Sequence, residues 1–127
     1  MTLTARGSAL IAVALCISLP GVARLQAHHS MAMYDQQNNI TITGTVKRIE
    51  LKNPHSIFYV TVTDAQGNQV DWTLECQPLA TLISYGWTKS TMKVGDRVAA
   101  VGSPARNGKP AMLVRAIQLP DGRTIKT

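Results

Sequence analysis

Apolar and polar residues alternate along most of the chain, and this alternation predicts a protein built mainly of β-strands. The longest alternating stretch, residues 40–64, contains two strands joined at Asn53-Pro54-His55. Its first strand alternates strictly as far as Val46 and then slips by one residue at Lys47-Arg48. Such a slip indicates a β-bulge, which bends a strand so that it can serve two sides of a closed barrel. We therefore expect residues 40–64 to form the first half of a small barrel.

Three more strands follow in the second half of the chain. Residues 70–76 alternate again, which predicts a strand with one face in the core. Residues 97–102 and 111–119 predict two further strands, separated by a loop rich in proline and glycine. A tight turn at residues 120–123 then leads into a short tail.

A short helix is expected between the third and fourth strands, over residues 78–86. Pro78 suits the first turn of a helix, and Gly86 can adopt the left-handed conformation that ends one. The apolar residues on one side of this helix are Leu79, Leu82 and Ile83.

Three strands, a short helix and two strands is the element order of the five-stranded oligonucleotide/oligosaccharide-binding (OB) barrel. We therefore predict one mainly β domain, an OB-like barrel over residues 40–127, preceded by a flexible polar arm at residues 28–39. A chain of 127 residues has no room for a second domain of usual size. Because this barrel carries many unrelated binding functions, the fold alone does not identify the function.

Residues 1–27 have the character of a secretory signal peptide. Arg6 precedes an apolar run, residues 9–19, which Pro20-Gly21 closes. The run is too short to span a bilayer as an ordinary transmembrane helix. Cleavage fits after Ala23 or after Ala27. We therefore expect a periplasmic or secreted protein that has no membrane attachment after cleavage.

Cleavage after Ala27 would change both charge and cysteine content. Losing Arg6 and Arg24 reduces the 13 basic side chains to 11 against 7 acidic ones, a net charge of +4. This is short of the dense positive charge expected of a nucleic-acid-binding protein. Loss of Cys16, which alternatively could carry a lipid, leaves Cys76 without an intramolecular disulfide partner. Cys76 is then a core residue, a soft metal ligand or an intermolecular bridge.

Short motifs throughout the mature chain resemble a domain-of-unknown-function family of small exported bacterial proteins. The motifs are His28-His29-Ser30, Asp35, Thr43-Gly44-Thr45-Val46, Asn53-Pro54-His55, Gly86-Trp87, Val94-Gly95-Asp96 and Leu119-Pro120-Asp121-Gly122. The resemblance implies an exported OB-type barrel without an assigned reaction, and it favours cleavage after Ala27. The chain departs from the family pattern at Met31, Met33 and Cys76.

The three histidines of the chain suggest a transition-metal site. If His28 becomes the amino terminus, its amine and imidazole can chelate one ion, because both are available as neutral ligands at mildly alkaline pH. Such nitrogen ligands favour Cu(II), whereas the thioethers of Met31 and Met33 would suit Cu(I). The predicted metal ligands are therefore His28, His29, Met31, Met33 and His55, with copper as the expected cofactor.

Simpler interpretations of the same residues stay open. The His28-His29 pair can be solvated on a mobile arm, and His55 can instead cap the turn after Pro54 with a backbone hydrogen bond. His28 and His55 can meet only if the arm runs back along the barrel. Otherwise the amino-terminal pair acts alone or bridges two chains.

A glycan- or peptide-binding module is the alternative function. Tyr59 offers a stacking platform of the kind that OB barrels use for extended polymers. The basic residues on the same strands and loops are Lys47, Arg48, Lys52, Arg106 and Lys109.

An enzyme is not expected. No spacing supports a nucleophile, base and acid, and Asp71 and Glu75 are expected on the exposed face of a strand without a cleft. A copper-dependent oxidase that uses an amino-terminal histidine is the one catalytic alternative.

Overall fold

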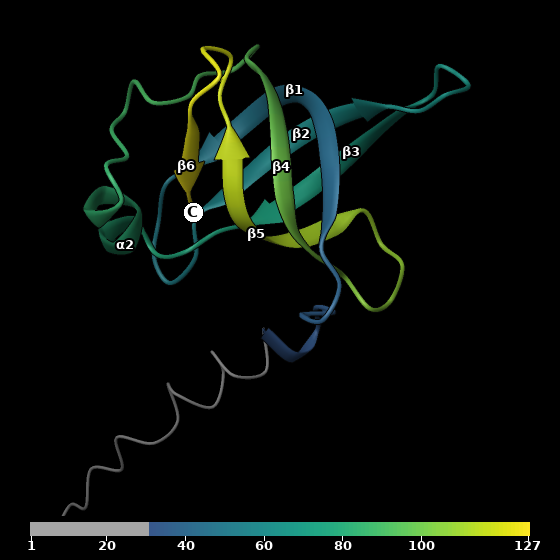
Figure 1. The fold of residues 1–127 in the computed structure, drawn as a ribbon, viewed down its shortest axis with the longest axis horizontal. Coiled ribbons are helices and arrows are strands. Elements are labelled where there is room, and N and C mark those ends of the chain that lie inside the picture. The colour runs from purple at the N-terminus through teal and green to yellow at the C-terminus, as the bar shows by residue number, and fades with distance from the viewer. Residues whose placement is uncertain (1–30) are drawn as a thin grey trace, which may run out of the picture.

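A computed structural model describes residues 31–127, which form a small β-barrel with a short helix at one end (Figure 1). The predicted signal peptide, both candidate cleavage sites, His28 and His29 lie outside the described residues. In chain order, the elements are β1 (Ile40–Glu50), β2 (Ile57–Thr63), β3 (Gln69–Glu75), α2 (Leu79–Ser84), β4 (Arg97–Pro104), β5 (Ala111–Gln118) and β6 (Thr124–Lys126).

The strands form one sheet that closes on itself. Its order is β3-β2-β1-β4-β5-β6, and a parallel pairing of β3 with β5 closes β1 to β5 into a five-stranded barrel. The predicted fold class is therefore confirmed, including the short helix between the third and fourth strands. The tail that the sequence left without structure adds β6, which pairs antiparallel with β5.

The bulge in β1 is confirmed at the predicted position. Val46 pairs with Val60 and Arg48 pairs with Tyr59, so Lys47 is the additional residue. The first part of β1 pairs with β4, and its second part pairs with β2. The bend at Lys47 thus lets one strand contribute to two sides of the barrel.

The barrel interior holds the apolar core. Its largest fully buried members are Val46, Phe58, Val60, Leu74, Cys76, Leu82, Met112 and Ile117. Burial raises the pKa of the Cys76 thiol, because a thiolate would be poorly solvated there. Cys76 is therefore a small core residue rather than an exposed ligand.

The helix contributes less to the core than its sequence suggests. Leu82 is buried, Leu79 is half-buried and Ile83 is 58% exposed. Trp87, which follows the helix, is buried, and the centre of its ring lies 5.2 Å from the centre of the Phe58 ring. The apolar side of α2 is thus only partly covered by the barrel.

Within residues 31–127, no helix has the length and apolar character needed to cross a membrane.

Candidate functional site

Three polar side chains from distant parts of the chain meet on the outside of the barrel. The Tyr34 hydroxyl donates a hydrogen bond to Oε2 of Glu75 at 2.7 Å. The Nδ1 atom of His55 lies 3.2 Å from Oε1 of the same carboxylate. One carboxylate therefore connects the segment before β1, the loop between β1 and β2, and the end of β3.

Strand register brings His55 to Glu75. β2 and β3 pair Ile57 with Glu75, so the loop residues just before β2 lie beside the last residue of β3. Beyond the strand ends, the Ser56 amide donates to the Gln77 carbonyl and the Cys76 amide donates to the Ser56 carbonyl. These bonds fix the backbone next to His55.

Backbone hydrogen bonds to the loop between β4 and β5 hold Tyr34 close to Glu75. Tyr34 forms an isolated bridge with Ala105, and the Arg106 amide donates to the Met33 carbonyl at 2.9 Å. OB barrels bind ligands on the outer face of strands 2 and 3, between the β1–β2 and β4–β5 loops. The three polar side chains therefore lie on the surface that this fold commonly uses for binding.

The environment keeps Tyr34 neutral and the carboxylate partly shielded. Burial and the hydrogen bond to Glu75 raise the pKa of Tyr34, because a phenolate would be poorly solvated and would repel the carboxylate. The Glu75 side chain is only 15% exposed. The prediction that Glu75 is exposed is therefore wrong, because Tyr34 and His55 contact its carboxylate, whereas Asp71 on the same face of β3 is exposed as predicted.

The His55 ring is oriented by its contact with the carboxylate. Nδ1 is buried and approaches Glu75 at ion-pair distance, although without the alignment of a hydrogen bond. Nε2 lies across the ring from Nδ1 and is the nitrogen left to bind a ligand. In metal-binding histidines, one ring nitrogen usually contacts a carboxylate or carbonyl oxygen, which orients the ring, while the other nitrogen binds the ion.

The described part of the chain does not contain a complete metal site. Among residues 31–127, no group of three or more His, Cys, Asp or Glu residues is arranged to hold a metal ion. His55 and its carboxylate partner can therefore supply only part of a coordination sphere.

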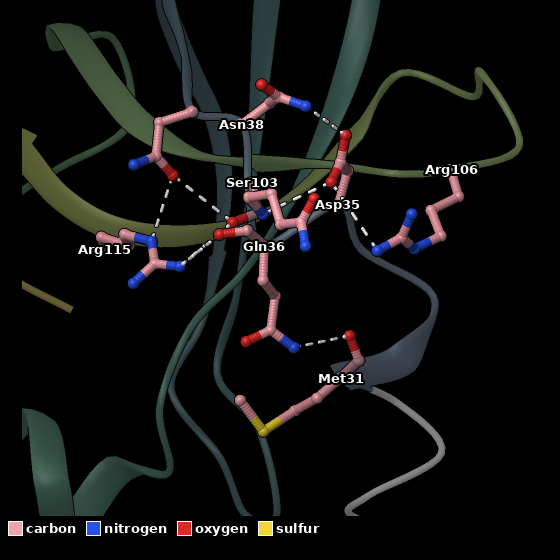
Figure 2. A network of polar contacts seen from close by, with 9 residues as sticks. Met31, Asp35, Gln36, Asn38, Ser103, Arg106 and Arg115 are labelled. Carbon is pink, nitrogen blue, oxygen red and sulfur yellow. Dashed lines mark hydrogen bonds and ion pairs between the residues drawn. The ribbon is translucent and has the colours of Figure 1, made fainter.

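A polar network holds the segment before β1 against the barrel, as Figure 2 shows. The Arg115 side chain donates to Asn39 Oδ1 at 3.1 Å and to the Gln36 carbonyl at 3.4 Å. The Asp35 amide donates to the Pro104 carbonyl at 2.8 Å. The segment thus runs alongside β4 and β5 before it enters β1.

Asp35 also organises its own segment. Its carboxylate accepts a 2.8 Å hydrogen bond from Asn38 Nδ2 and lies 3.7 Å from the Arg106 guanidinium (Figure 2). The bond from Asn38 keeps the pKa of Asp35 below its usual value. The carboxylate is therefore ionised at neutral pH, which favours its hydrogen bond from Asn38 and its attraction to Arg106.

The predicted methionine ligands differ in their surroundings. Met31 lines a cavity of about 200 Å³ together with Gln77, Tyr85 and Arg115. Since the Gln77 carbonyl accepts the amide next to His55, Met31 is on the side of the barrel where His55 lies. Both methionines are exposed, Met31 to 40% and Met33 to 59%. Neither thioether is needed to fill the core.

The residues of the predicted glycan site lie in three places. Lys47, Arg48, Tyr59 and Asp71 line a groove of about 400 Å³ on the outer sheet face, with the Arg48 guanidinium 3.9 Å from the centre of the Tyr59 ring. Arg106 and Lys109 lie in the β4–β5 loop, whereas Lys52 pairs with Glu50 in the β1–β2 region.

Comparison with known proteins establishes the family and nothing about the activity. The chain belongs to DUF6152, a family of unknown function, whose profile matches residues 15–114. This confirms the family type that the sequence motifs indicated. A search of curated proteins finds no match.

Proposed function

We propose that this DUF6152 protein is an exported binding protein that holds a copper ion through His28, His29 and His55. The observation that carries the proposal is the contact of Glu75 with both Tyr34 and His55, at 2.7 Å and 3.2 Å. Through Glu75, the segment that follows His28 and His29 is held close to His55, which is the third histidine of the chain.

Chain length supports a joint site. The backbone advances by at most about 3.8 Å per residue, so the Cα atom of His29 lies within roughly 8 Å of that of Met31. Met31 in turn lines a cavity with Gln77, next to the backbone that carries His55. The amino-terminal histidines therefore do not need to cross the roughly 40 Å length of an extended β1 to reach His55.

The donor set suits copper. A chain that begins with His28 offers an amine and an imidazole to Cu(II), and His29 and His55 add further imidazole nitrogens. Met31 and Met33 provide thioethers suited to Cu(I). Glu75 acts as a positioning residue, because its carboxylate fixes one edge of the His55 ring and leaves the other edge for the ion.

Calorimetric titration with Cu(II) tests the proposal on three forms of the mature protein. The first begins at His28, the second has one additional residue before His28, and the third carries His55→Gln. We expect tight binding by the first form and weaker binding by the other two. Gln66→Ala, in the exposed β2–β3 turn, is the control and should bind like the first form. Equally weak binding by all forms would contradict the proposal.

The location of the first residue is a separate requirement. Mass spectrometry of the exported protein should give a mass that begins at His28, and a product that begins at Arg24 would remove the chelating amine. The same measurement tests the expected periplasmic or secreted location.

Glycan or peptide binding is the second candidate, favoured by the groove at Tyr59. A planar guanidinium over an aromatic ring forms an extended flat surface on which a sugar or peptide bond can stack. Tyr59→Ala should weaken binding of such a ligand without unfolding the barrel, because this side chain is only half-buried. Unchanged binding would count against this candidate.

A further inference from the structure

An apolar groove lies at the end of the barrel that α2 only partly covers. It has a volume of about 430 Å³ and is lined by Leu51, Leu79, Ile83, Trp87, Thr88 and Lys89. Ile83 is 58% exposed, an unusual degree of exposure for a large apolar helix residue. The groove is distinct from the surface that carries Tyr34, Glu75 and His55.

A second hollow continues the groove. It has a volume of about 360 Å³ and shares four residues with the first: Leu51, Trp87, Thr88 and Lys89. Ile49 and Met92 extend the apolar lining, and Lys93 lies at its edge. Each hollow alone is within the size range of small-molecule sites, and because they share four lining residues we call the two together the apolar channel.

The charge around this channel has one sign. Lys89 and Lys93 are its charged lining residues, and no Asp or Glu lines either hollow. Within residues 31–127, neither ammonium group has a carboxylate within ion-pair distance. An apolar lining with two cations beside it is complementary to an apolar chain with an anionic head.

We infer that this channel binds a fatty acid, with the acyl chain along Leu51, Ile83 and Trp87 and the carboxylate near Lys89 or Lys93. An uncharged apolar ligand would form no ion pair with either ammonium group. A hydrophilic anion would leave the apolar floor exposed to water. A fatty acid satisfies both features, and this binding requires neither a metal ion nor the amino-terminal histidines.

Trp87 provides the measurement. In a Trp72→Phe protein it is the only tryptophan, since the chain contains two, and Trp87 lines both hollows. Titration with monomeric octanoate, decanoate and dodecanoate should change its fluorescence saturably. Each added methylene should tighten binding about fourfold until the channel is full, as expected for burial of one methylene.

Matched variants separate the contribution of the acyl chain to binding from that of the carboxylate. Ile83→Ser should weaken binding of all three acids, whereas Val94→Ser, which changes an apolar residue 64% exposed and outside the channel, should not. Lys89→Gln combined with Lys93→Gln should weaken binding of the acids about two- to fivefold and leave the alcohols of equal chain length unchanged.

Three results would overturn the inference: no saturable binding of the acids by equilibrium dialysis, affinity independent of chain length, or equal affinity for acid and alcohol in the unsubstituted protein. Circular dichroism of each variant verifies that it is folded. Because the titrations contain no metal, failure here leaves the copper proposal untouched, and failure of copper binding leaves this inference untouched.

Discussion

Tyr34 shows how one side chain can join a terminal segment to a folded domain. Its ring is buried and its hydroxyl donates to Glu75, and both effects raise its pKa above the ordinary value of 10. In the unfolded chain the phenol loses its proton near pH 10. The stabilisation is therefore fully present below about pH 10 and is lost as the pH rises through the higher folded-state pKa.

Phenolate absorbance tests this behaviour. The difference in titration between the unsubstituted protein and Tyr34→Phe isolates the phenol of Tyr34, which should ionise only above pH 10. Tyr34→Phe should also lower the free energy of unfolding by about 1–3 kcal/mol, because the bond to a charged acceptor is lost. Ionisation of Tyr34 at its ordinary pKa would show that the phenol is not held as described.

Gly44 is required by the close approach of two strands. A Cβ atom at this position would lie 2.5 Å from the Thr61 carbonyl oxygen and 2.6 Å from Cγ1 of Val60. Gly44→Ala should therefore reduce the free energy of unfolding in urea by about 1–3 kcal/mol. Thr43→Ala, at the exposed neighbouring position, is the control and should change it by less than about 1 kcal/mol. Equal effects would refute the steric explanation.

Some residues of the candidate site could be predicted from the sequence and others could not, for physical reasons. His55 was identified because histidine is rare in the chain and can ligate metals. Glu75 was assigned to an exposed face because alternation gives the direction of a side chain and not what covers it. Tyr34 had no detectable signal, since its role depends on a contact 41 residues away in sequence.

At the scale of elements, the bulge at Lys47 determines the path of β1. Deleting Lys47 would keep Val46 inward and Arg48 outward but remove the additional residue that bends the strand. We expect the deletion to destabilise the barrel by at least about 2 kcal/mol in urea unfolding. Lys47→Ala keeps the residue count and removes only an exposed ion pair with Asp71, so its effect should be small. Similar losses in both variants would argue against the importance of the bulge.

Arg115 helps to hold the segment before β1 against the barrel. Arg115→Ala removes donors to Asn39 and to the Gln36 carbonyl. Loss of about 1.4 kcal/mol of local stability would speed hydrogen exchange of the Asp35 and Arg106 amides roughly tenfold. Both amides donate across the contact between this segment and the barrel, to Pro104 and Met33. Unchanged exchange would mean that other contacts hold the segment.

The helix illustrates the limit of periodicity at the same scale. Spacing correctly indicated a short helix, and it grouped Leu79, Leu82 and Ile83 on one apolar side. Periodicity does not reveal how much of that side the rest of the protein covers. Only Leu82 is buried, and the uncovered remainder forms a wall of the proposed fatty-acid channel.

For the whole molecule, element order was sufficient to predict the barrel. The β1 bulge and the position of the helix together restrict the topology to few alternatives. The added strand β6 was missed because three residues, Thr124–Lys126, are too few for alternation to be recognised. The closing contact between β3 and β5 is parallel and non-local, so it followed from the fold type rather than from any local pattern.

The effect of Cu(II) on the stability of the whole protein distinguishes a joint copper site from a chelate at the amino terminus alone. An amine and imidazole of His28 exist equally in folded and unfolded chains, so binding to them alone adds no stability. A site that includes His55 exists only in the folded protein. Cu(II) at 100 times its dissociation constant should then stabilise the protein by at most about 2.7 kcal/mol, because the His28 chelate of the unfolded chain also binds the ion, and the melting temperature should rise by up to about 10 °C for a domain of this size.

His55→Gln supplies the control for this measurement, because it leaves the amino terminus unchanged. The variant should still bind Cu(II) more weakly through His28, yet its melting temperature should shift little. A large shift that persists in His55→Gln would exclude His55 from the site. No shift in either protein, together with tight binding by calorimetry, would assign the ion to the amino-terminal histidines alone and make Glu75 a purely structural partner of His55.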